Sequence, residues 1–280
     1  MSVSNQRKAA LDRRRGDGGL SPLDTRQAQL FAGRYADRPG APVAVVIAAY
    51  NEEATVETVV KAVPPELCRL ATEVIVVVDG ASDGTAGAAK AAGALVCDVP
   101  VNRGQGAALR LGYHLARARG ARYVMTTDAD GQYESADMER ALSPVVGGTA
   151  DFVSGSRRLG STASTDAVRN VGVVVFATLI SVLVRRRVTD PSCGLRAMTA
   201  ELTGKVVLDQ PQYQASELLI GAAMAGYRLG EVPIAMKTRR AGKSKKAGNF
   251  IYGLRFGSAV VGTWWRELRA RERSINTKRS

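Results

Sequence analysis

The stretch YVMTTDADGQ, residues 123–132, decides the fold class of this chain. Its first half is apolar and β-branched, which is typical of a buried strand, and two carboxylates follow one residue apart. Residues i and i+2 of a strand point to the same side, so Asp128 and Asp130 can converge on one point, where Gln132 adds a neutral oxygen. A hard cation such as Mg²⁺ or Mn²⁺ prefers these ligands and shares them with substrate phosphates. A solvated Asp-Gly turn is the alternative.

Strands and helices alternate on both sides of this stretch. Apolar runs predict strands at 43–49, 73–78, 94–97, 121–127 and 152–154, and helical periodicity predicts helices at 52–63, 82–92, 104–119 and 135–146. This order is typical of an α/β domain with a mostly parallel sheet, in which ligands bind beyond the carboxyl ends of the strands. The polar or glycine positions that follow these strands are therefore expected to lie together: Asn51, Asp79, Asn102, Asp128 and Gly155.

The second half of the chain has a different pattern. An apolar helix is expected over 168–184, followed by three arginines at 185–187. A helix is expected over 216–225, a strand over 227–235, and a final helix over 250–271 after a basic loop at 237–246. The arginines and tryptophans of these helices suit a position in a membrane interface, and packing against the core is the alternative. No run of 18 or more uncharged apolar residues exists, so a membrane-spanning helix is not expected.

The net charge of +13 is concentrated at the two ends of the chain. Residues 1–40 carry 8 Lys or Arg against 4 Asp or Glu, residues 41–236 carry 18 against 20, and residues 237–280 carry 13 against 2. Such an excess implies an anionic partner: substrate phosphates, an acidic membrane surface or nucleic acid. Residues 1–40 are expected to form a basic, disordered segment without a secretory signal. Three scattered cysteines without metal-ligand spacing favour a reducing, cytoplasmic setting.

The motifs, in their order along the chain, resemble those of the family 2 glycosyltransferases, and within them the polyprenyl-phosphate (dolichol-phosphate) mannose synthases. They are AYNEE (49–53), VVDGASDGT (77–85), NRGQGAA (102–108), DADGQ (128–132), GSR (155–157), DPSCGLR (190–196) and RAGKSK (240–245). The resemblance implies a GT-A fold, which is a Rossmann-like nucleotide-diphospho-sugar transferase fold, over residues 41–246. Residues 247–280 would add an amphipathic helix and a basic tail.

The resemblance also implies the site residues. The metal ligands would be Asp128, Asp130 and Gln132, holding Mg²⁺ or Mn²⁺. Arginine suits the phosphate contacts because it offers two parallel donors. The implied catalytic residues are Asp128, Asp130, Arg157 and Asp190, and the implied substrate-binding residues are Ala49, Tyr50, Asn51, Glu53, Asp79, Arg103, Gly104, Asp128, Ala129, Arg157, Arg169, Arg196, Arg240 and Lys245.

The expected reaction is inverting, metal-dependent transfer of a hexose from a nucleotide sugar of the GDP-mannose or UDP-glucose type to a polyprenyl phosphate. The enzyme would lie in the cytoplasm or on the cytoplasmic face of the membrane, and a homo-oligomer is compatible with the sequence. The alternative is transfer to a soluble hydroxyl acceptor such as a glycerate, a saccharide or a secondary metabolite. That chemistry needs a carboxylate base, for which Asp190 and Glu217 are the candidates.

A third hypothesis is a non-catalytic protein whose basic tails bind nucleic acid. It is disfavoured, because the acids at the strand ends would repel a phosphate backbone unless metal were bound. The only histidine, His114, lies inside a predicted helix, so a histidine-based catalytic triad is excluded.

Overall fold

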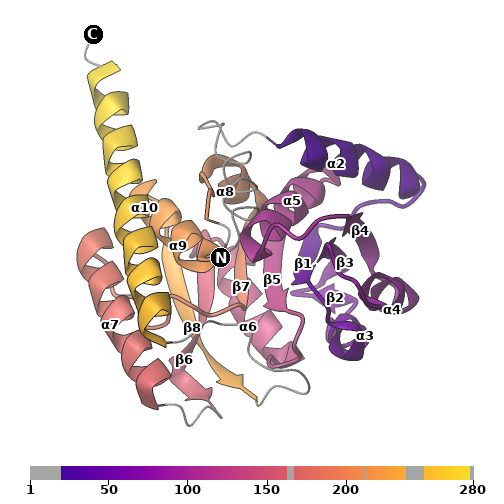
Figure 1. The fold of residues 1–280 in the computed structure, drawn as a ribbon, viewed down its shortest axis with the longest axis horizontal. Coiled ribbons are helices and arrows are strands. Elements are labelled where there is room, and N and C mark those ends of the chain that lie inside the picture. The colour runs from indigo at the N-terminus through magenta and orange to yellow at the C-terminus, as the bar shows by residue number, and fades with distance from the viewer. Residues whose placement is uncertain (1–19, 163–166, 211, 238–248, 278–280) are drawn as a thin grey trace.

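The computed structural model describes residues 20–162, 167–210, 212–237 and 249–277, and they form a three-layer α/β/α domain (Figure 1). The strands of its first half are β1 (Val43–Ala49), β2 (Glu66–Leu67), β3 (Leu70–Asp79), β4 (Leu95–Val99) and β5 (Tyr123–Asp128). The strands of its second half are β6 (Phe152–Thr162), β7 (Arg196–Thr199) and β8 (Leu229–Met236). The expected strands are all present, and β2 and β7 are additional.

The sheet is mostly parallel, as its connections predict. The strand order is β4-β3-β1-β5-β7-β6-β8, with β2 paired to the start of β3. Strands β1, β3, β4 and β5 are parallel, and β7 enters antiparallel between β5 and β6. The parallel strands therefore deliver the loops that follow β1, β3 and β5 to one edge of the sheet.

Side chains of β1 alternate between two separate cores, because successive residues of a strand face opposite sides. Val43, Val45 and Ile47 pack under α3 (Glu53–Ala62), α4 (Thr85–Ala91) and α6 (Ser135–Val146). Ala44 and Val46 pack into the other core, with α5 (Gln105–Ala118), α8 (Ala200–Lys205) and α9 (Gln214–Met224). Both faces of the sheet are thus covered, which explains the uninterrupted apolar runs of its strands.

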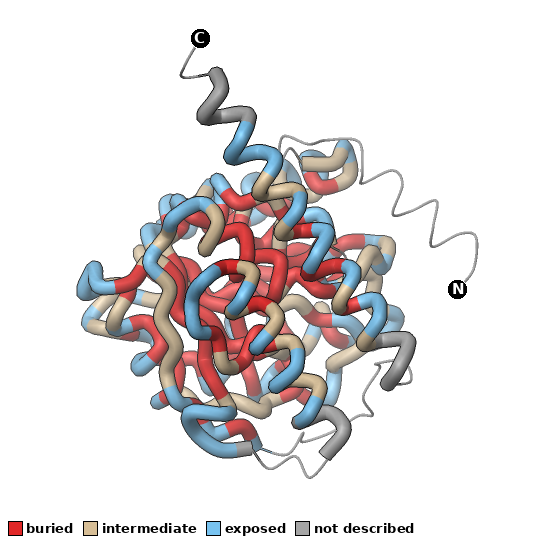
Figure 2. The backbone as a smooth tube through the Cα atoms, turned by 90° about the vertical axis from the view of Figure 1, so that its left-hand side faces the viewer, coloured by how far each residue is buried: buried red, intermediate tan, exposed pale blue. Residues whose placement is uncertain are grey.

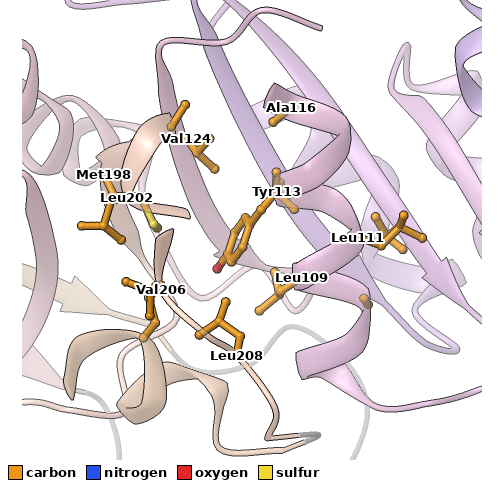
Figure 3. Close-up of a cluster of buried hydrophobic side chains, with 14 of the residues drawn as sticks. Leu109, Leu111, Tyr113, Ala116, Val124, Met198, Leu202, Val206 and Leu208 are labelled. Carbon is orange, nitrogen blue, oxygen red and sulfur yellow. The ribbon is translucent and has the colours of Figure 1, made fainter. Parts of the chain in front are cut away.

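The second core is built around Tyr113, which is 1% exposed and points from α5 toward the helices of the second half (Figure 3). Its hydroxyl accepts a hydrogen bond from Gln214 Nε2 at 3.0 Å, so the polar end of the ring is satisfied inside the core. Met198, Leu202 and Val206 pack around the same cluster. The two halves of the chain therefore share one core and form one unit.

An ordered helix lies within the N-terminal segment that the sequence analysis expects to be disordered. Helix α2 (Pro22–Arg34) begins at Ser21, whose hydroxyl accepts a hydrogen bond from the Asp24 amide. Phe31 and Tyr35 pack edge to face, and the Tyr35 hydroxyl accepts a hydrogen bond from the Val96 amide of edge strand β4. The expectation is therefore wrong for residues 22–34, and residues 1–19 lie outside the described residues.

Two further helices cover one side of the molecule. Helix α7 (Ala167–Val184) and helix α10 (Asn249–Thr277) lie side by side there, and Phe176 and Phe256 meet edge to face at 4.5 Å (Figure 1). Arg266 ties α10 to the buried Glu217 of α9 at 2.8 Å. Packing against the core, one of the two expected alternatives, thus accounts for one face of each helix. None of the described helices is both long and apolar enough to cross a membrane.

Gly112 allows α5 to approach the sheet closely, and this contact can be tested. A Cβ at this position would lie closer than 3.0 Å to Val46 Cγ1, so Gly112→Ala is expected to lower the free energy of unfolding by about 1–3 kcal/mol. Gly87 of α4 has no atom within 4 Å of its added Cβ, so Gly87→Ala is the matched control and should raise stability by up to about 1 kcal/mol. Urea unfolding of both variants measures the difference. Equal stability of the two variants would show that α5 is not held this close to β1.

Candidate active site

The candidate site lies where β1, β3 and β5 end next to each other. Ala48 of β1 pairs with Asp128 of β5, and Ala49 pairs with Val78 of β3. The polar residues that follow each strand are therefore brought together by the register of the sheet. This confirms the expected convergence of Asn51, Asp79 and Asp128 at one edge.

The loops after β1 and β3 are bonded to one another. Asn51 Oδ1 accepts the Ser82 amide at 2.9 Å, and Glu53 Oε2 accepts the Gly84 amide at 3.0 Å. Asn51 has a φ of 53°, a left-handed conformation that asparagine tolerates better than most residues. These side chains shape the rim of the site, and the neighbouring Tyr50 is 39% exposed.

Asp79 is buried at the end of β3 and holds the loop that follows β4. Its Oδ2 accepts the amides of Arg103 and Gly104 at 2.8 and 2.7 Å. Its Oδ1 has no hydrogen-bond partner within the described part of the chain and lies 3.6 Å from Arg103 Nε. Burial raises the pKa of Asp79, although the two amides act in the opposite direction. A buried acceptor left without a donor is rare in a folded protein and marks a place where a ligand or water can bond.

Arg103 links this loop to the N-terminal helix. Its Nη1 donates to Asp24 Oδ1 of α2 at 2.6 Å, and both side chains are nearly buried, at 10% and 7% exposed. Its Nη2 has no hydrogen-bond partner among the described residues. Arg103 was expected to meet substrate directly, whereas the structure shows its charge paired first with Asp24. The sequence analysis missed Asp24, because nothing in a polar N-terminal segment indicates which of its acids is buried.

The two carboxylates of the DADGQ motif lie at the end of β5 in different surroundings. Asp128 is half-buried, and its oxygens accept hydrogen bonds from Gln105 Nε2 at 3.1 Å and the Tyr133 hydroxyl at 3.2 Å. Asp130 is 5% exposed, and its Oδ1 accepts the Gln132 amide at 3.3 Å across the turn. Gln105 and Tyr133 are site residues that the sequence analysis did not identify, since their spacing from Asp128 carries no recognisable pattern.

The loop before β7 closes over Asp128. The Tyr133 hydroxyl, which donates to Asp128, also accepts the Gly194 amide at 2.9 Å. A Cβ at Gly194 would collide with the Asp128 carboxylate, so only glycine allows this approach. Burial raises the pKa of Tyr133 well above its usual value, and the nearby Cys193 and Asp128 raise it further, so the hydroxyl remains a proton donor.

These groups fit a hard divalent cation that is shared with a diphosphate. No cluster of three or more His, Cys, Asp and Glu side chains occurs in the described ranges, so protein groups alone do not complete a cage. Mg²⁺ is typically bound by one or two carboxylates plus substrate phosphates and water. Two carboxylates and an amide at one strand end would supply the protein share of such a site, and their role as metal ligands stays a prediction.

Arg157 and Asp190 form a buried ion pair beside this loop. Arg157 donates from Nε and Nη2 to the two Asp190 oxygens at 2.5 and 2.6 Å, and Asp190 is 0% exposed. Burial lowers the pKa of Arg157, but the bond to Asp190 outweighs it and the net pKa is raised. Glu231, which sequence reasoning missed, accepts the amides of Thr189 and Asp190 and fixes the loop. Both Asp190 oxygens are thus engaged by Arg157, and its expected roles as a catalytic group or a base stay predictions.

Other predicted residues lie deeper or outside the described residues. Arg196 is 4% exposed and donates to Gln214 and to the Cys193 carbonyl, so it has little surface for a substrate and its expected contact is not supported. Arg169 lies in α7, but its side chain is not among the described parts of the structure. Arg240 and Lys245 lie outside the described residues altogether. The segment that carries the last two leaves β8 at Lys237, whose carbonyl accepts Gln132 Nε2 at 2.9 Å.

Comparisons with known proteins agree with this architecture. The sequence model of "Glycosyl transferase family 2" matches residues 44–206. The chain belongs to this family. It is a glycosyltransferase with the GT-A fold, as the motifs predict.

Relatives and solved structures extend the comparison over most of the glycosyltransferase. A dolichyl-phosphate hexose transferase of Haloferax volcanii is 32% identical over 219 residues, covering 78% of this chain and 92% of the relative. An undecaprenyl-phosphate mannosyltransferase of Micrococcus luteus is 29% identical over 252 residues, covering 82% and 98%. Glucosyl-3-phosphoglycerate synthase of Mycobacterium tuberculosis, solved with Mn²⁺, UDP and phosphoglyceric acid, has a TM-score of 0.60 at 23% identity, covering 86% and 82%.

The Asp24–Arg103 pair of the glycosyltransferase can be tested by a double-mutant cycle. Asp24→Asn removes the shorter of the two ion pairs of the buried Arg103 guanidinium, so the free energy of unfolding should fall by about 3 kcal/mol. The exposed pair of Glu57 and Lys61 is the matched control, and Glu57→Gln should cost less than about 0.5 kcal/mol. Urea unfolding of Asp24→Asn, Arg103→Gln and the double variant gives the coupling energy. Additive effects would show that the pair does not hold α2 to the loop.

Proposed function

We propose that this glycosyltransferase transfers a hexose from a nucleotide sugar to a polyprenyl phosphate with inversion at the anomeric carbon. One observation carries the proposal: both carboxylates that could act as a base for a hydroxyl acceptor are engaged. Asp190 is ion-paired with Arg157, and Glu217, 1% exposed, accepts two amides and Arg266. An acceptor that is already ionised fits such a site, because no proton has to be removed from it.

The relatives support the same class of acceptor. The names of the Haloferax and Micrococcus proteins specify a dolichyl-phosphate and an undecaprenyl-phosphate substrate, and each alignment covers more than 90% of the relative. Both acceptors are polyprenyl phosphates. We therefore assign this chemical class, and not a particular lipid length or sugar, to the acceptor.

The donor would bind across the ends of β1, β3 and β5. Asp79 Oδ1, which accepts no hydrogen bond within the described residues, can accept one from a nucleobase or ribose, and the exposed ring of Tyr50 can stack on the base. Asp128, Asp130 and Gln132 would hold Mg²⁺ or Mn²⁺. When bound, the cation neutralises the charge that builds on the departing nucleoside diphosphate. Structural neighbours with the same fold have been solved with Mn²⁺ or Mg²⁺ and UDP.

The bond changes in this reaction balance without an external proton. An acceptor phosphate oxygen attacks the anomeric carbon from the face opposite the leaving group. The bond from that carbon to the diphosphate oxygen breaks, and its electron pair leaves with the nucleoside diphosphate.

Arg157 positions the Asp190 loop, and Arg169, Arg240 and Lys245 are the cations that we propose for the acceptor phosphate. The enzyme would work from the cytoplasmic face of a membrane, where it is peripheral.

The reaction can be tested by measuring release of nucleoside diphosphate from GDP- and UDP-sugars. We expect release only with Mg²⁺ or Mn²⁺ and a short polyprenyl phosphate together, with one donor preferred. Asp128→Ala and Asp130→Ala should each reduce kcat by at least about a hundredfold, because the leaving diphosphate loses its electrostatic support. Asp37→Ala, which removes an exposed acid far from the strand ends, is the control. Unimpaired transfer by Asp128→Ala at saturating metal would refute the assigned metal site.

The soluble acceptor is the second candidate, because the glucosyl-3-phosphoglycerate synthase that shares the fold was solved with phosphoglyceric acid. The pH dependence of kcat separates the two acceptors. A phosphate monoester has its second pKa near about 6, so transfer to a polyprenyl phosphate should be independent of pH between about 7 and 9. Transfer that needs a base should rise with pH through the pKa of that base. Transfer to phosphoglyceric acid that needs no lipid and that Asp190→Asn abolishes would favour the hydroxyl acceptor.

A further inference from the structure

Exposed apolar side chains are concentrated on two helices. Of the ten large hydrophobic side chains that are exposed within the described residues, seven belong to α7 and α10. Val182 is 70% exposed, Val171 63% and Leu254 62%, and the others are Val174, Val175, Val261 and Trp265. An exposed apolar patch of this kind marks a surface that meets another apolar phase or molecule.

The two helices lie on one side of the molecule and run next to each other when seen from that side (Figure 2). On each helix the exposed apolar side chains recur at helical spacing and form one stripe: Val171, Val174, Val175 and Val182 on α7, and Leu254, Val261 and Trp265 on α10. Their opposite faces are used internally: Ile180 of α7 and Val260 of α10 are 0% and 1% exposed, and Trp264 Nε1 donates to the Leu183 carbonyl at 3.1 Å. The exposed apolar faces of α7 and α10 are therefore held in a fixed arrangement by the packing of their inner faces.

A cluster of cations adjoins the apolar stripe at the end of α7. Arg185, Arg186 and Arg187 line a pocket of about 480 Å³ together with Thr178 and Val182 of the outer stripe, and all three arginines are exposed. The helix ends with Arg186 N–H bonded to the Ser181 carbonyl and Arg185 N–H bonded to the Val182 carbonyl. This ending places Arg185 at a φ of 53°, in the position that glycine usually occupies.

A second cationic group lies on α10. The Arg269 guanidinium is 5.1 Å from the Trp265 ring, and Trp265 stacks on Trp264. Residues 237–280 hold 13 Lys or Arg and only 2 Asp or Glu. Exposed valines, leucine and tryptophan beside arginines are typical of helices that lie in the plane of a membrane interface.

We infer that the outer face of α7 and α10 docks on an anionic membrane, with a lipid headgroup phosphate in the Arg185–Arg187 pocket. A second copy of the chain fits this surface less well, since a two-fold interface would bring the same cationic patch from both copies together with few acids to balance it. The inference deepens the proposed function, because it names the surface that carries the enzyme to a lipid acceptor. Its test does not use the reaction, so the two can fail separately.

The test is co-sedimentation of the full chain with vesicles of phosphatidylcholine alone or with about 30% phosphatidylglycerol, in about 0.1 M salt. We expect binding only to the anionic vesicles. Arg186→Gln/Arg187→Gln should reduce partitioning about thirtyfold, because each cation near an anionic surface raises the affinity about fivefold. Val175→Ser/Val182→Ser should reduce it about tenfold or more through lost apolar contact. Arg185 is kept because of its unusual backbone.

Two matched controls separate local docking from general attraction. Lys61→Gln/Lys90→Gln removes two exposed charges from α3 and α4, and Leu30→Ser removes an exposed apolar side chain from α2. Both should bind vesicles as the unaltered protein does, and circular dichroism should show that all variants are folded. An equal loss of vesicle binding in the lysine and arginine double variants would overturn the assignment of the Arg185–Arg187 pocket as a headgroup site. A concentration-dependent dimer that Val175→Ser/Val182→Ser abolishes, without vesicle binding, would overturn the membrane surface.

Discussion

The buried carboxylate of Asp79 is the interaction on which the candidate site depends. One of its oxygens accepts two consecutive amides of the loop after β4, which fixes that loop against the end of β3. The fixed loop then reaches in two directions: Arg103 pairs with Asp24 of α2, and Gln105 donates to Asp128. The N-terminal helix, the middle of the sheet and the DADGQ motif are thus coupled through a single buried side chain. Hydrogen bonds to a buried carboxylate are strong. Removing the Asp79 carboxylate would free the loop after β4, and the contacts of Arg103 with Asp24 and of Gln105 with Asp128 would lose their support.

The sequence predicts the sheet well because both of its faces are covered. Uninterrupted apolar runs such as Val43–Ala49 are shorter than a typical helix and therefore indicate buried strands, and the polar residues that follow them mark the functional edge. Helix α2 is missed because only Phe31 and Asp24 of its thirteen residues are buried, so its amphipathic signal is weak. Its Ser21 cap and Pro22 at the first position are recognisable in retrospect. Strand β7 is missed because it has four residues and contains Arg196.

The positions of the site residues are more predictable than their partners. A strand end places Asp79 or Asp128 at the edge of the sheet, but whether such a carboxylate meets a ligand or a neighbouring loop depends on contacts between segments far apart in sequence. Asp190 shows the difference: its motif suggests chemistry, and its two oxygens are bound by an arginine 33 residues earlier. The same is true of Glu217, which Arg266 of α10 reaches from the end of the chain. Periodicity carries no information about such pairs.

The connectivity of the chain joins the candidate site to the outer helices. Strand β6, which carries Arg157, leads into α7, and strand β8 ends at Lys237, bonded to Gln132, before the chain continues to α10. Two connections, 163–166 and 238–248, therefore begin at strands of the site and end at the helices that we propose to lie on the membrane. The candidate site and the proposed membrane surface are therefore both continuous in sequence with β6 and β8, two neighbouring strands of the sheet.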